Sequence, residues 1–464
     1  MSKPNRPGAA PKQGGKPPAN AAKGGQKAAP KPAARAAQSA PQKQGPQKSA
    51  PKSAPQGPRG RQQNSAHSAS VELDEGEELV RQLSALAVAM AGAVKSGNAP
   101  VDQDGERIGQ QDLDRLIRKC LRARDDESLY EALEQVRFED RGAWSFLRQA
   151  IEDAAQILVM RRGERLQEIN TFMIPLLVRT KGGLQQAAVF QNGDDFEALK
   201  DSLQQSGLES ARARVVLVAH AYHPDEIEAL SYSEVEAMNR DAYTSLTDKK
   251  VLSVPAIERS MRGWPASDFA AADDALELRF LLGFSLKELD DTFYVVPTDE
   301  AKADAYFEQR AERFRAWSEK NAPLLQRCLS GSSAPDACQV HFMYQDLFFG
   351  GKQTGNAEYR TLQMLSELEQ GLAAAQAAAA DAMAVFALAS EDDETGDWQL
   401  TVQLRARDDQ RLLAQSLQVL DGDPDEQLLD VAHAVASLGV TQSMLAEGLD
   451  DAGQPHNMRP FGEL

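Results

Sequence analysis

The chain has 464 residues and a formal net charge of −18, but this charge is divided unevenly along it. The first 68 residues hold thirteen Lys or Arg and no Asp or Glu, which leaves 38 basic against 69 acidic residues in the remainder, a net charge of −31. No apolar run reaches the roughly 18–20 residues of a membrane span, and no apolar segment follows the basic N-terminus as in a secretory signal. We therefore expect a cytoplasmic protein of two or three domains that has no membrane partner.

Residues 1–70 are predicted to form a disordered basic tail, because they contain no Val, Ile, Leu, Phe, Trp or Tyr to bury. Twelve of the 23 prolines lie between Pro4 and Pro58, among Ala, Gln, Gly, Ser and Lys. An extended chain with a cation every few residues can follow an RNA or DNA backbone without reading its sequence, although it has no aromatic residue for base stacking. The cations expected to make this contact are Lys12, Lys16, Lys23, Lys27, Lys31, Arg35, Lys43, Lys48, Lys52, Arg59 and Arg61. Alternatively, the tail binds an acidic protein or the acidic body, or has no specific partner.

Residues 71–162 are predicted to be a helical region, because apolar residues recur there at spacings of three and four. The four amphipathic stretches cover residues 79–94, 113–121, 129–136 and 144–158. The fourth should end before Gly163. Cys120 falls on one of these apolar stripes, so we expect a buried structural thiol. Cys328 and Cys338 flank a loop and could meet, but reduced thiols without a zinc site are expected in a cytoplasmic protein.

Residues 163–447 alternate between strand and helix patterns, which predicts an α+β or mixed α/β body behind the helical region. Strands are expected at 172–178, 215–218, 276–284, 292–296 and 340–344, with a hairpin over 383–388 and 398–404. Pro175 predicts an edge or a bulge in the first strand. Helices are expected from Asp194 or Asp195 to Gly207, from Asp299 onward, over 359–368 and over 428–438.

Two further features of this body are specific enough to test. The helix from Asp299 should bury Ala303, Tyr306, Phe307, Phe314 and Trp317, and Pro323 should begin a new short helix. Residues 448–464 are predicted to be a flexible C-terminus.

The glycine-rich stretch Gly350–Gly355 is the first candidate for chemistry. A phosphate-binding P-loop needs a Gly five residues before Gly-Lys-Ser/Thr, but Asp346 stands at that distance from Gly351-Lys352 and Gln353 follows the lysine. The stretch is expected between a strand and a helix, where its backbone could still wrap an anion. An ordinary glycine-rich turn is the alternative.

The second candidate is His220–Glu226, which follows the strand at 215–218. Its two imidazoles and its carboxylates could hold a metal or transfer a proton. The other histidines of the body, His341, His433 and His456, are isolated and supply no further ligands. We therefore expect Asp225 to cap a short helix and neither His220 nor His223 to ligate a metal. The sequence identifies no catalytic residue, metal site or cofactor site.

The order of features resembles an uncharacterised family of proteobacterial proteins defined by a domain of unknown function. The resemblance lies in Leu83-Ser-Ala-Leu-Ala-Val-Ala-Met-Ala, in the helical stretch after it, and in Phe172-Met-Ile-Pro-Leu-Leu-Val. It covers about residues 79–420 and not the tail. It implies a bacterial cytoplasmic protein, and it assigns no activity and no functional residue.

Three functional hypotheses follow from the sequence. The first is a non-catalytic cytoplasmic protein whose acidic body binds a protein partner and whose basic tail makes weak, nonspecific nucleic-acid contact. The second is an enzyme of unknown type with a site near His220–Glu226 or Gly350–Gly355. The third is a scaffold or regulator whose tail binds an acidic protein.

Overall fold

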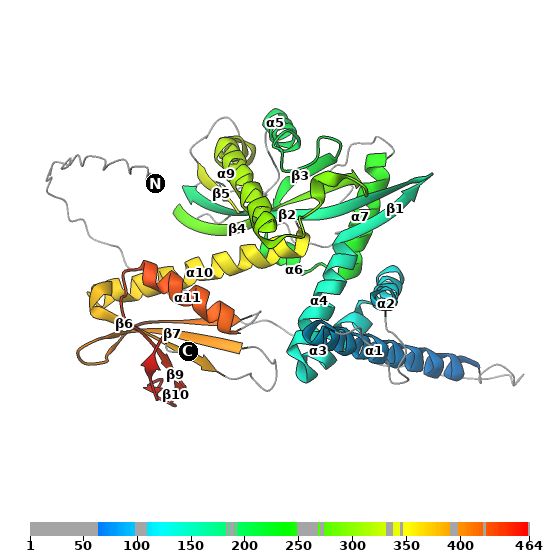
Figure 1. Cartoon of the computed structure of the whole chain (residues 1–464). Helices are drawn as coiled ribbons and strands as arrows, with labels where there is room; N and C mark the ends of the chain where they lie inside the picture. The colour runs from blue at the N-terminus through cyan, green and yellow to red at the C-terminus, as the bar shows by residue number, and fades with distance from the viewer. Residues whose placement is uncertain are drawn as a thin grey trace, which may run out of the picture. The chain divides into compact units, whose positions relative to one another are not determined.

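Two five-stranded sheets and a set of N-terminal helices make up the described part of the chain (Figure 1). The computed structural model describes residues 64–97, 109–181, 184, 190, 193–247, 268–269, 273–330, 337–343, 347–389, 398–420 and 424–462. The predicted tail therefore lies outside the described residues up to residue 63, as do all eleven of its candidate nucleic-acid contacts. The architecture is α+β, as the sequence predicted.

Four helices precede the first sheet, and they correspond to the four predicted amphipathic stretches. Their bounds are α1 Asn64–Ser96, α2 Gln110–Ala123, α3 Asp126–Glu139 and α4 Arg141–Gln156. The helical region has no separate core, because its apolar faces join one continuous cluster with one face of the first sheet. Residues 64–70 of the predicted tail belong to α1.

The end of α4 differs from the prediction, because the helix ends at Gln156 and the chain turns directly into a strand. Ile157 has extended φ and ψ of −123° and 121°, and residues 157–162 pair with residues 165–170 in a hairpin. Gly163, the first residue of the two-residue turn, has φ of 65°, which glycine adopts without strain. Pairing with a neighbouring strand decided this conformation, and helical periodicity carries no information about it.

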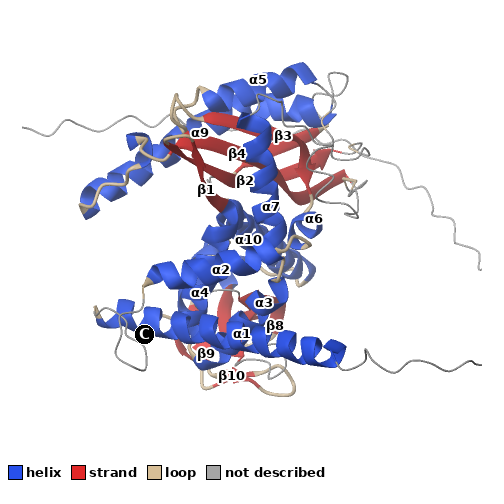
Figure 2. Ribbon diagram, turned by 90° about the vertical axis from the view of Figure 1, so that its right-hand side faces the viewer, coloured by secondary structure: helices blue, strands red, loops and turns tan. Residues whose placement is uncertain are grey.

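The first sheet has the order β1-β2-β4-β3, with β5 also paired to β2, and all its pairings are antiparallel. Its strands are β1 Ile157–Arg162, β2 Arg165–Lys181, β3 Arg214–Tyr222, β4 Asp273–Glu288 and β5 Cys338–Phe342. One face packs against α5 (Gly193–Gln204) and α9 (Glu300–Ser330). The other face packs against α7 (Tyr232–Thr247) and the start of α10 (Phe348–Ala374), with the short α6 (Pro224–Glu228) beside it (Figures 1 and 2).

Pro175 lies in a gap between two neighbours of β2, which explains how a central strand accommodates it. On this side β1 pairs with residues 165–170 of β2, and β5 pairs with residues 176–180. The Pro175 carbonyl accepts a hydrogen bond from Met343 N, and Met173 N donates to the Leu347 carbonyl just before α10. The edge character predicted from proline is therefore confined to a short gap, and the start of α10 occupies it.

Helix α10 contacts both sheets, and three glycines allow its close approach (Figure 1). A Cβ at Gly351 would lie 2.5 Å from the Met173 carbonyl oxygen, and one at Gly355 would lie 2.8 Å from the Phe280 ring. Farther along the same helix, a Cβ at Gly371 would collide with Ala414 of the second sheet. Small residues at these positions thus set the distance between the helix and both sheets.

The second sheet has the order β12-β9-β6-β7-β8, and its predicted hairpin is confirmed by the antiparallel pairing of β6 with β7. Its strands are β6 Ala382–Ala389, β7 Trp398–Ala406, β8 Leu412–Leu420, β9 Ser443–Ala446 and β12 Arg459–Pro460. The 3₁₀ turn η2 (Ala379–Asp381) leads into β6, and one face of the sheet packs against α11 (Pro424–Ser437) and the end of α10. The sequence did not predict β8, β9 or β12.

Two local predictions between the strands β4 and β5 were wrong. Residues 292–294 form the 3₁₀ turn η1 (Thr292–Tyr294) and no strand, because the Asp291 carboxylate accepts hydrogen bonds from Phe293 N and Ser210 Oγ. Pro323 lies inside α9 and starts no new helix. Buried Leu325, Cys328 and Leu329 continue the apolar face of α9, so packing sustains the helix past the proline.

The C-terminal segment, predicted to be flexible, forms three short strands, one of which is the edge strand of the second sheet. The pair β10 (Gly448–Leu449) and β11 (Pro455–His456) is followed by β12, which pairs with β9. The Phe461 ring packs 5.4 Å from the Phe386 ring. The segment was hard to predict because its strands are two residues long and are stabilised by contacts with distant strands.

All three cysteines are free and buried, as expected for structural thiols. Phe307, which the sequence placed on the buried side of α9, is 53% exposed, whereas Phe314 and Trp317 are buried as predicted. No helix in the ranges given above is long and apolar enough to cross a membrane.

Candidate functional site

A cavity of about 350 Å³ lies where the helical region meets the first sheet, and we call it the α3–α10 pocket. Its lining comes from α3, α4, the end of α6, the start of α7, the connection between them and the first turns of α10. The lining residues are Tyr130, Leu133, Glu134, Arg137, Trp144, Arg148, Glu152, Glu228, Leu230, Tyr232, Phe349, Lys352 and Gln353. The pocket thus combines aromatic walls with three basic and three acidic side chains.

Helical spacing explains how α3 and α4 present their shares of the lining. On α4, Trp144, Arg148 and Glu152 are spaced four residues apart and form one row beside the buried row of Leu147, Ile151 and Ala155. On α3, Tyr130, Glu134 and Arg137 follow the same rule with spacings of four and three. Each helix therefore buries one row in the core and exposes the next row to the pocket.

Buried polar side chains fix the helices around the pocket. Asn239 of α7 donates to the carbonyls of Ala155 and Gln156 at the end of α4, at 3.1 and 2.6 Å, and its Oδ1 accepts from Thr171 of β2. Gln156 in turn accepts from Phe349 N at the start of α10, at 3.1 Å. Asp126 of α3 accepts from the Ser233 amide and hydroxyl at the start of α7. These bonds satisfy helix ends that would otherwise lack partners, and they hold α3, α4, α7 and α10 together with strand β2 in one arrangement.

Aromatic rings form one wall of the pocket. The Tyr232 ring centroid lies 5.3 Å from that of Tyr130 and 5.5 Å from that of Phe349. Trp144 is covered by the guanidinium groups of Arg137 and Arg148, which lie 5.9 and 5.3 Å from the ring centroid. Stacked rings and cation–π contacts of this kind stiffen the wall and keep apolar surface facing the cavity.

Glu152 is the buried acid of the pocket, with a side chain that is 5% exposed. Its carboxylate accepts from Arg148 Nε at 2.8 Å and from Gln353 Nε2 at 3.2 Å. Burial raises the pKa of this carboxyl, and the ion pair with Arg148 opposes the shift. Burial beside Glu152 likewise raises the pKa of the Tyr232 hydroxyl. A carboxyl and a phenol with perturbed pKa values in one concave site are typical of binding and proton-transfer sites.

The raised pKa of Glu152 predicts how stability changes with pH. The folded protein holds this proton to a higher pH than the unfolded chain, so the stabilisation is complete below the ordinary pKa of 4.5 and is lost as pH rises through the folded value. In Glu152→Gln this loss should be absent. The free energy of unfolding of the variant, relative to the natural protein, should therefore increase as pH rises above 4.5 in urea titrations at several pH values.

Glu78 provides a control of opposite sign for this experiment. Hydrogen bonds from Arg81 and Gln82 lower the pKa of the exposed Glu78 carboxyl. A lowered pKa gives stabilisation that is complete above the ordinary pKa of 4.5 and is lost as pH falls through the folded value. Relative to the natural protein, Glu78→Gln should therefore lose stability as pH rises towards 4.5, by a small amount because the group is solvated. A pH trend of the same sign for both variants would contradict the assignment of the shift to burial of Glu152.

The structure brings the two candidate segments of the sequence together. Helix α6, which contains Asp225 and Glu226, packs against α10, and Asn356 Nδ2 donates to Glu228 at 3.5 Å. However, Gly350–Gly355 is no loop, because α10 begins at Phe348 and its glycines contact β2 and β4. Neither the ordinary glycine-rich turn nor the backbone anion loop considered from the sequence is present. Lys352 and Gln353 line the α3–α10 pocket as side chains of a helix.

The His220–Glu226 segment is a strand end followed by a capped helix. His223 Nδ1 accepts from Asp225 N, and Glu226 accepts from His223 N at 2.6 Å, so His223 and not Asp225 is the capping residue. His220 is buried against Tyr222, and its Nε2 lies 3.6 Å from Glu226 Oε1. Within the described ranges, no group of three or more His, Cys, Asp or Glu side chains could hold a metal ion. That His220 and His223 do not ligate a metal stays a prediction.

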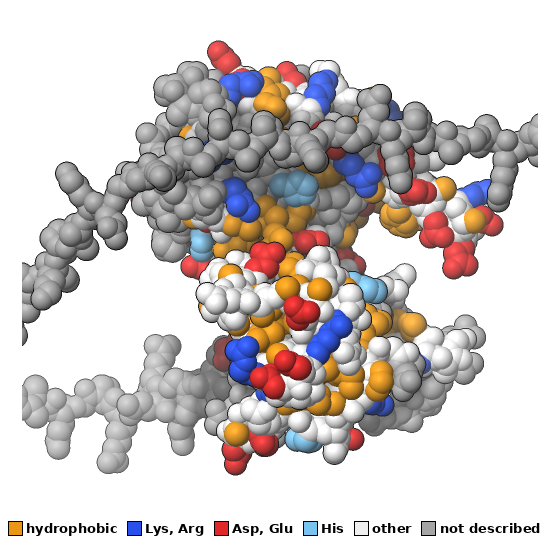
Figure 3. All heavy atoms as spheres, turned by 90° about the vertical axis from the view of Figure 1, so that its left-hand side faces the viewer, with side chains coloured by type: hydrophobic (Ala, Val, Ile, Leu, Met, Phe, Trp, Pro, Cys, Tyr) orange, Lys and Arg blue, Asp and Glu red, His pale blue; other side chains and the backbone are white. Residues whose placement is uncertain are grey.

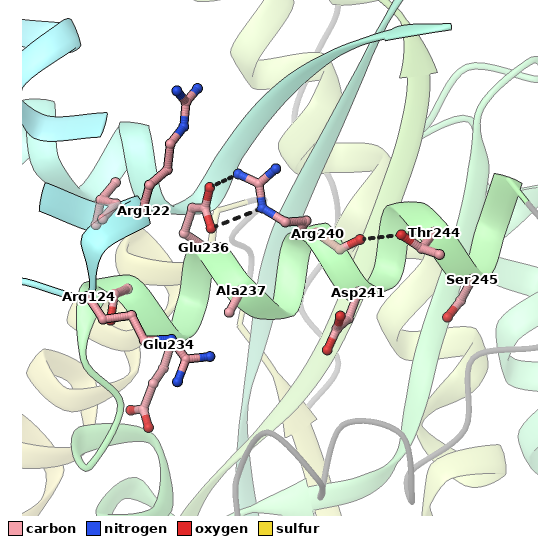
Figure 4. Close-up of a pocket in the computed structure, with 11 residues that line it drawn as sticks. Arg122, Arg124, Glu234, Glu236, Ala237, Arg240, Asp241, Thr244 and Ser245 are labelled. Atoms are coloured by element: carbon pink, nitrogen blue, oxygen red, sulfur yellow. Dashed lines mark hydrogen bonds and ion pairs between the residues drawn. The ribbon is translucent and has the colours of Figure 1, made fainter. Parts of the chain in front are cut away.

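A larger groove of about 750 Å³ runs between the end of α2 and α7 (Figure 4). Its walls carry charged and hydroxyl side chains with no aromatic ring, and Glu236 and Arg240 face each other along α7, as the close-up shows. Thr244 donates to the Arg240 carbonyl one turn later. These contacts run along α7 itself, so the groove is a weaker candidate than the α3–α10 pocket.

The α3–α10 pocket was not predicted from the sequence, because its residues lie on five helices and one connection between positions 130 and 353. One local signal was present. The row formed by Trp144, Arg148 and Glu152 places an ion pair and an aromatic ring beside the apolar stripe of a single helix. Such a row indicates a charged helix face next to the core, but only packing shows which helices close over it.

Comparison with known proteins identifies the family. No curated protein and no solved structure matches the chain. Residues 74–412 match the family described as "Protein of unknown function (DUF2863)", which agrees with the resemblance over about residues 79–420. Because this match covers most of the chain, the protein belongs to that family of unknown function, DUF2863.

Proposed function

We propose that this chain is a non-catalytic, cytoplasmic bacterial binding protein. Its acidic body binds a partner at the α3–α10 pocket, and its basic N-terminal tail makes weak, sequence-independent contact with nucleic acid. Three free, buried cysteines support a reducing compartment.

The composition of the pocket is the observation that carries the binding role. Tyr, Trp and Arg dominate the residues that contribute most to binding energy, because they offer large rigid surfaces with a polar end. The α3–α10 pocket gathers Tyr130, Tyr232, Trp144, Arg137 and Arg148 in one concave site. Buried hydrogen bonds at Asn239 and Gln156 organise the site before any partner arrives.

The charge distribution supports the role of the tail. Thirteen cations with no acid lie in residues 1–68, against a net charge of −31 in the remainder. On the face shown in Figure 3, Asp and Glu side chains are scattered among Lys and Arg and do not gather in one patch. The net negative charge of the remainder opposes phosphate at long range, so we assign the attraction to nucleic acid to the tail.

A salt titration of random-sequence RNA and duplex DNA tests this role. The full-length protein should bind both, and the slope of log affinity against log salt should be roughly −0.7 to −0.9 per phosphate neutralised. Deleting residues 1–68 should abolish binding. Lys352→Met, which removes a cation of the pocket, should leave the affinity and its salt dependence unchanged.

Two outcomes would contradict the nucleic-acid role. One is equal affinity of the full-length and truncated proteins, and the other is no binding by either at about 50 mM salt. The second outcome would favour the alternative in which the tail binds an acidic protein and the chain acts as a scaffold or regulator.

A further inference from the structure

The α3–α10 pocket contains several hydrogen-bond donors that have no acceptor. Arg148 uses Nε to bind Glu152, and its two Nη groups make no hydrogen bond in the part of the chain that the structure describes. The same holds for the Trp144 indole N–H and for the Tyr232 and Tyr130 hydroxyls, within the same residues. A ligand that brings acceptor oxygens can replace solvent at these donors, and hydrogen bonds that join charged groups are the stronger ones.

Acceptors in the same pocket are largely occupied. Both Glu152 oxygens accept hydrogen bonds, from Arg148 and Gln353. Glu134 is paired with Arg137 at 3.8 Å, and Glu228 accepts from Asn356. A ligand that carries hydrogen-bond acceptors therefore complements the pocket better than a ligand that carries donors.

The walls of the pocket indicate which other chemical groups the ligand carries. The Tyr130, Tyr232 and Phe349 rings provide apolar surface along one side, and the Arg148 Nη groups offer the fork geometry that matches a carboxylate or phosphate. The volume of about 350 Å³ is at the small end of the range for ligand sites.

We propose that the α3–α10 pocket binds a small anion in which a carboxylate or phosphate is attached to an aromatic ring. The Arg148 Nη groups and the Tyr232 hydroxyl bind the anionic group, and the aromatic wall holds the ring. This assignment rests on the proposed binding role of the pocket and names the chemical class of its ligand.

Calorimetric titration of the full-length protein with four probes tests the assignment. Benzoate and phenyl phosphate carry both parts of the ligand, inorganic phosphate lacks the ring, and benzylamine carries the ring with the opposite charge. The two aromatic anions should bind, and inorganic phosphate and benzylamine should bind at least about tenfold more weakly, because each lacks one of the two recognised parts.

Arg148→Met has a matched control in Arg118→Met. Both arginines form an ion pair with an acid four residues away on their own helix, at 2.8 and 2.9 Å, and their side chains are 28% and 29% exposed. Arg148→Met should weaken phenyl phosphate binding about tenfold or more, and Arg118→Met should not change it. Arg148→Lys keeps the charge but loses the fork, so it should also weaken binding, and Tyr232→Phe should weaken it by about three- to tenfold.

The outcomes separate the ligand class from the binding role. Tighter binding of benzylamine than of benzoate would overturn the anion assignment and leave a pocket that binds cations. Equal binding of inorganic phosphate and phenyl phosphate would overturn the role of the aromatic wall. Unchanged affinity in a folded Arg148→Met, or no aromatic anion bound at about 10 mM, would overturn the assignment altogether. The nucleic-acid titration tests the proposed function independently of these results.

Discussion

Replacing Gly351 by alanine should lower the free energy of unfolding by about 3 kcal/mol, as expected for overpacking a close contact. The new Cβ would lie 2.5 Å from the Met173 carbonyl oxygen and 2.9 Å from the Met173 Cβ. The backbone of a central strand cannot move aside as the end of a flexible side chain can, so α10 must shift away from the first sheet. Urea unfolding of the full-length protein measures the change.

Gly92→Ala is the matched control, because Gly92 also lies inside a helix but a Cβ there would have no neighbour within 4 Å. It should stabilise the protein by about 0.5–1 kcal/mol through helix propensity alone. If Gly351→Ala were also neutral or stabilising, close approach of α10 to β2 would not be the reason for glycine at this position.

Arg405→Met should lower the free energy of unfolding by about 3–5 kcal/mol, because it leaves buried acceptors without donors. Arg405 is 2% exposed, and its guanidinium donates to Gln403 Oε1, the Gln410 carbonyl, Gln454 Oε1 and the Gly453 carbonyl. Burial lowers the pKa of this guanidinium, which faces carbonyl and amide oxygens in place of a directly bonded carboxylate. The side chain thus fixes the C-terminal segment onto β7.

Hydrogen exchange and an exposed control separate this local role from a general effect of losing a cation. Amides of residues 448–462 should exchange faster in Arg405→Met than in the natural protein. Arg411→Met, in which the replaced side chain is 60% exposed and 3.8 Å from Asp409, should change the free energy of unfolding by less than about 0.5 kcal/mol. Unchanged exchange in residues 448–462 of Arg405→Met would show that other contacts hold the segment.

Periodicity in the sequence predicted many of the long elements, although it missed the helix α7 and the strand β8. The amphipathic helices correspond to α1–α4, and the alternating run at 276–284 corresponds to the central strand β4. These elements were predictable because each buries one face, and the spacing of apolar residues records that face directly. The family resemblance was carried by the same packing segments, and the match over residues 74–412 confirms it.

Predictions failed where a distant contact outweighs local preference. The sequence gives no sign that residues 157–162 leave α4 and pair with β2, or that the cap at Asp291 turns residues 292–294 away from a strand. Pro323 does not end α9, because buried side chains continue on both sides of it. In each case the interaction that decides the conformation is a strand pairing, a side-chain cap or a packing contact, and the spacing of apolar residues along one helix or strand does not show it.

The candidate site also combines features that the sequence predicts with features that only the tertiary structure shows. The sequence by itself determined the charge asymmetry between the first 68 residues and the remainder, the α+β class, and the apolar faces of α2, α3 and α4. Only the tertiary structure decided that Gly351 and Gly355 are packing surfaces, and that Tyr130, Glu152, Tyr232 and Phe349 share one pocket. The physical reason is that helical spacing fixes which side chains share a face, whereas hydrogen bonds between distant helix ends fix which faces meet.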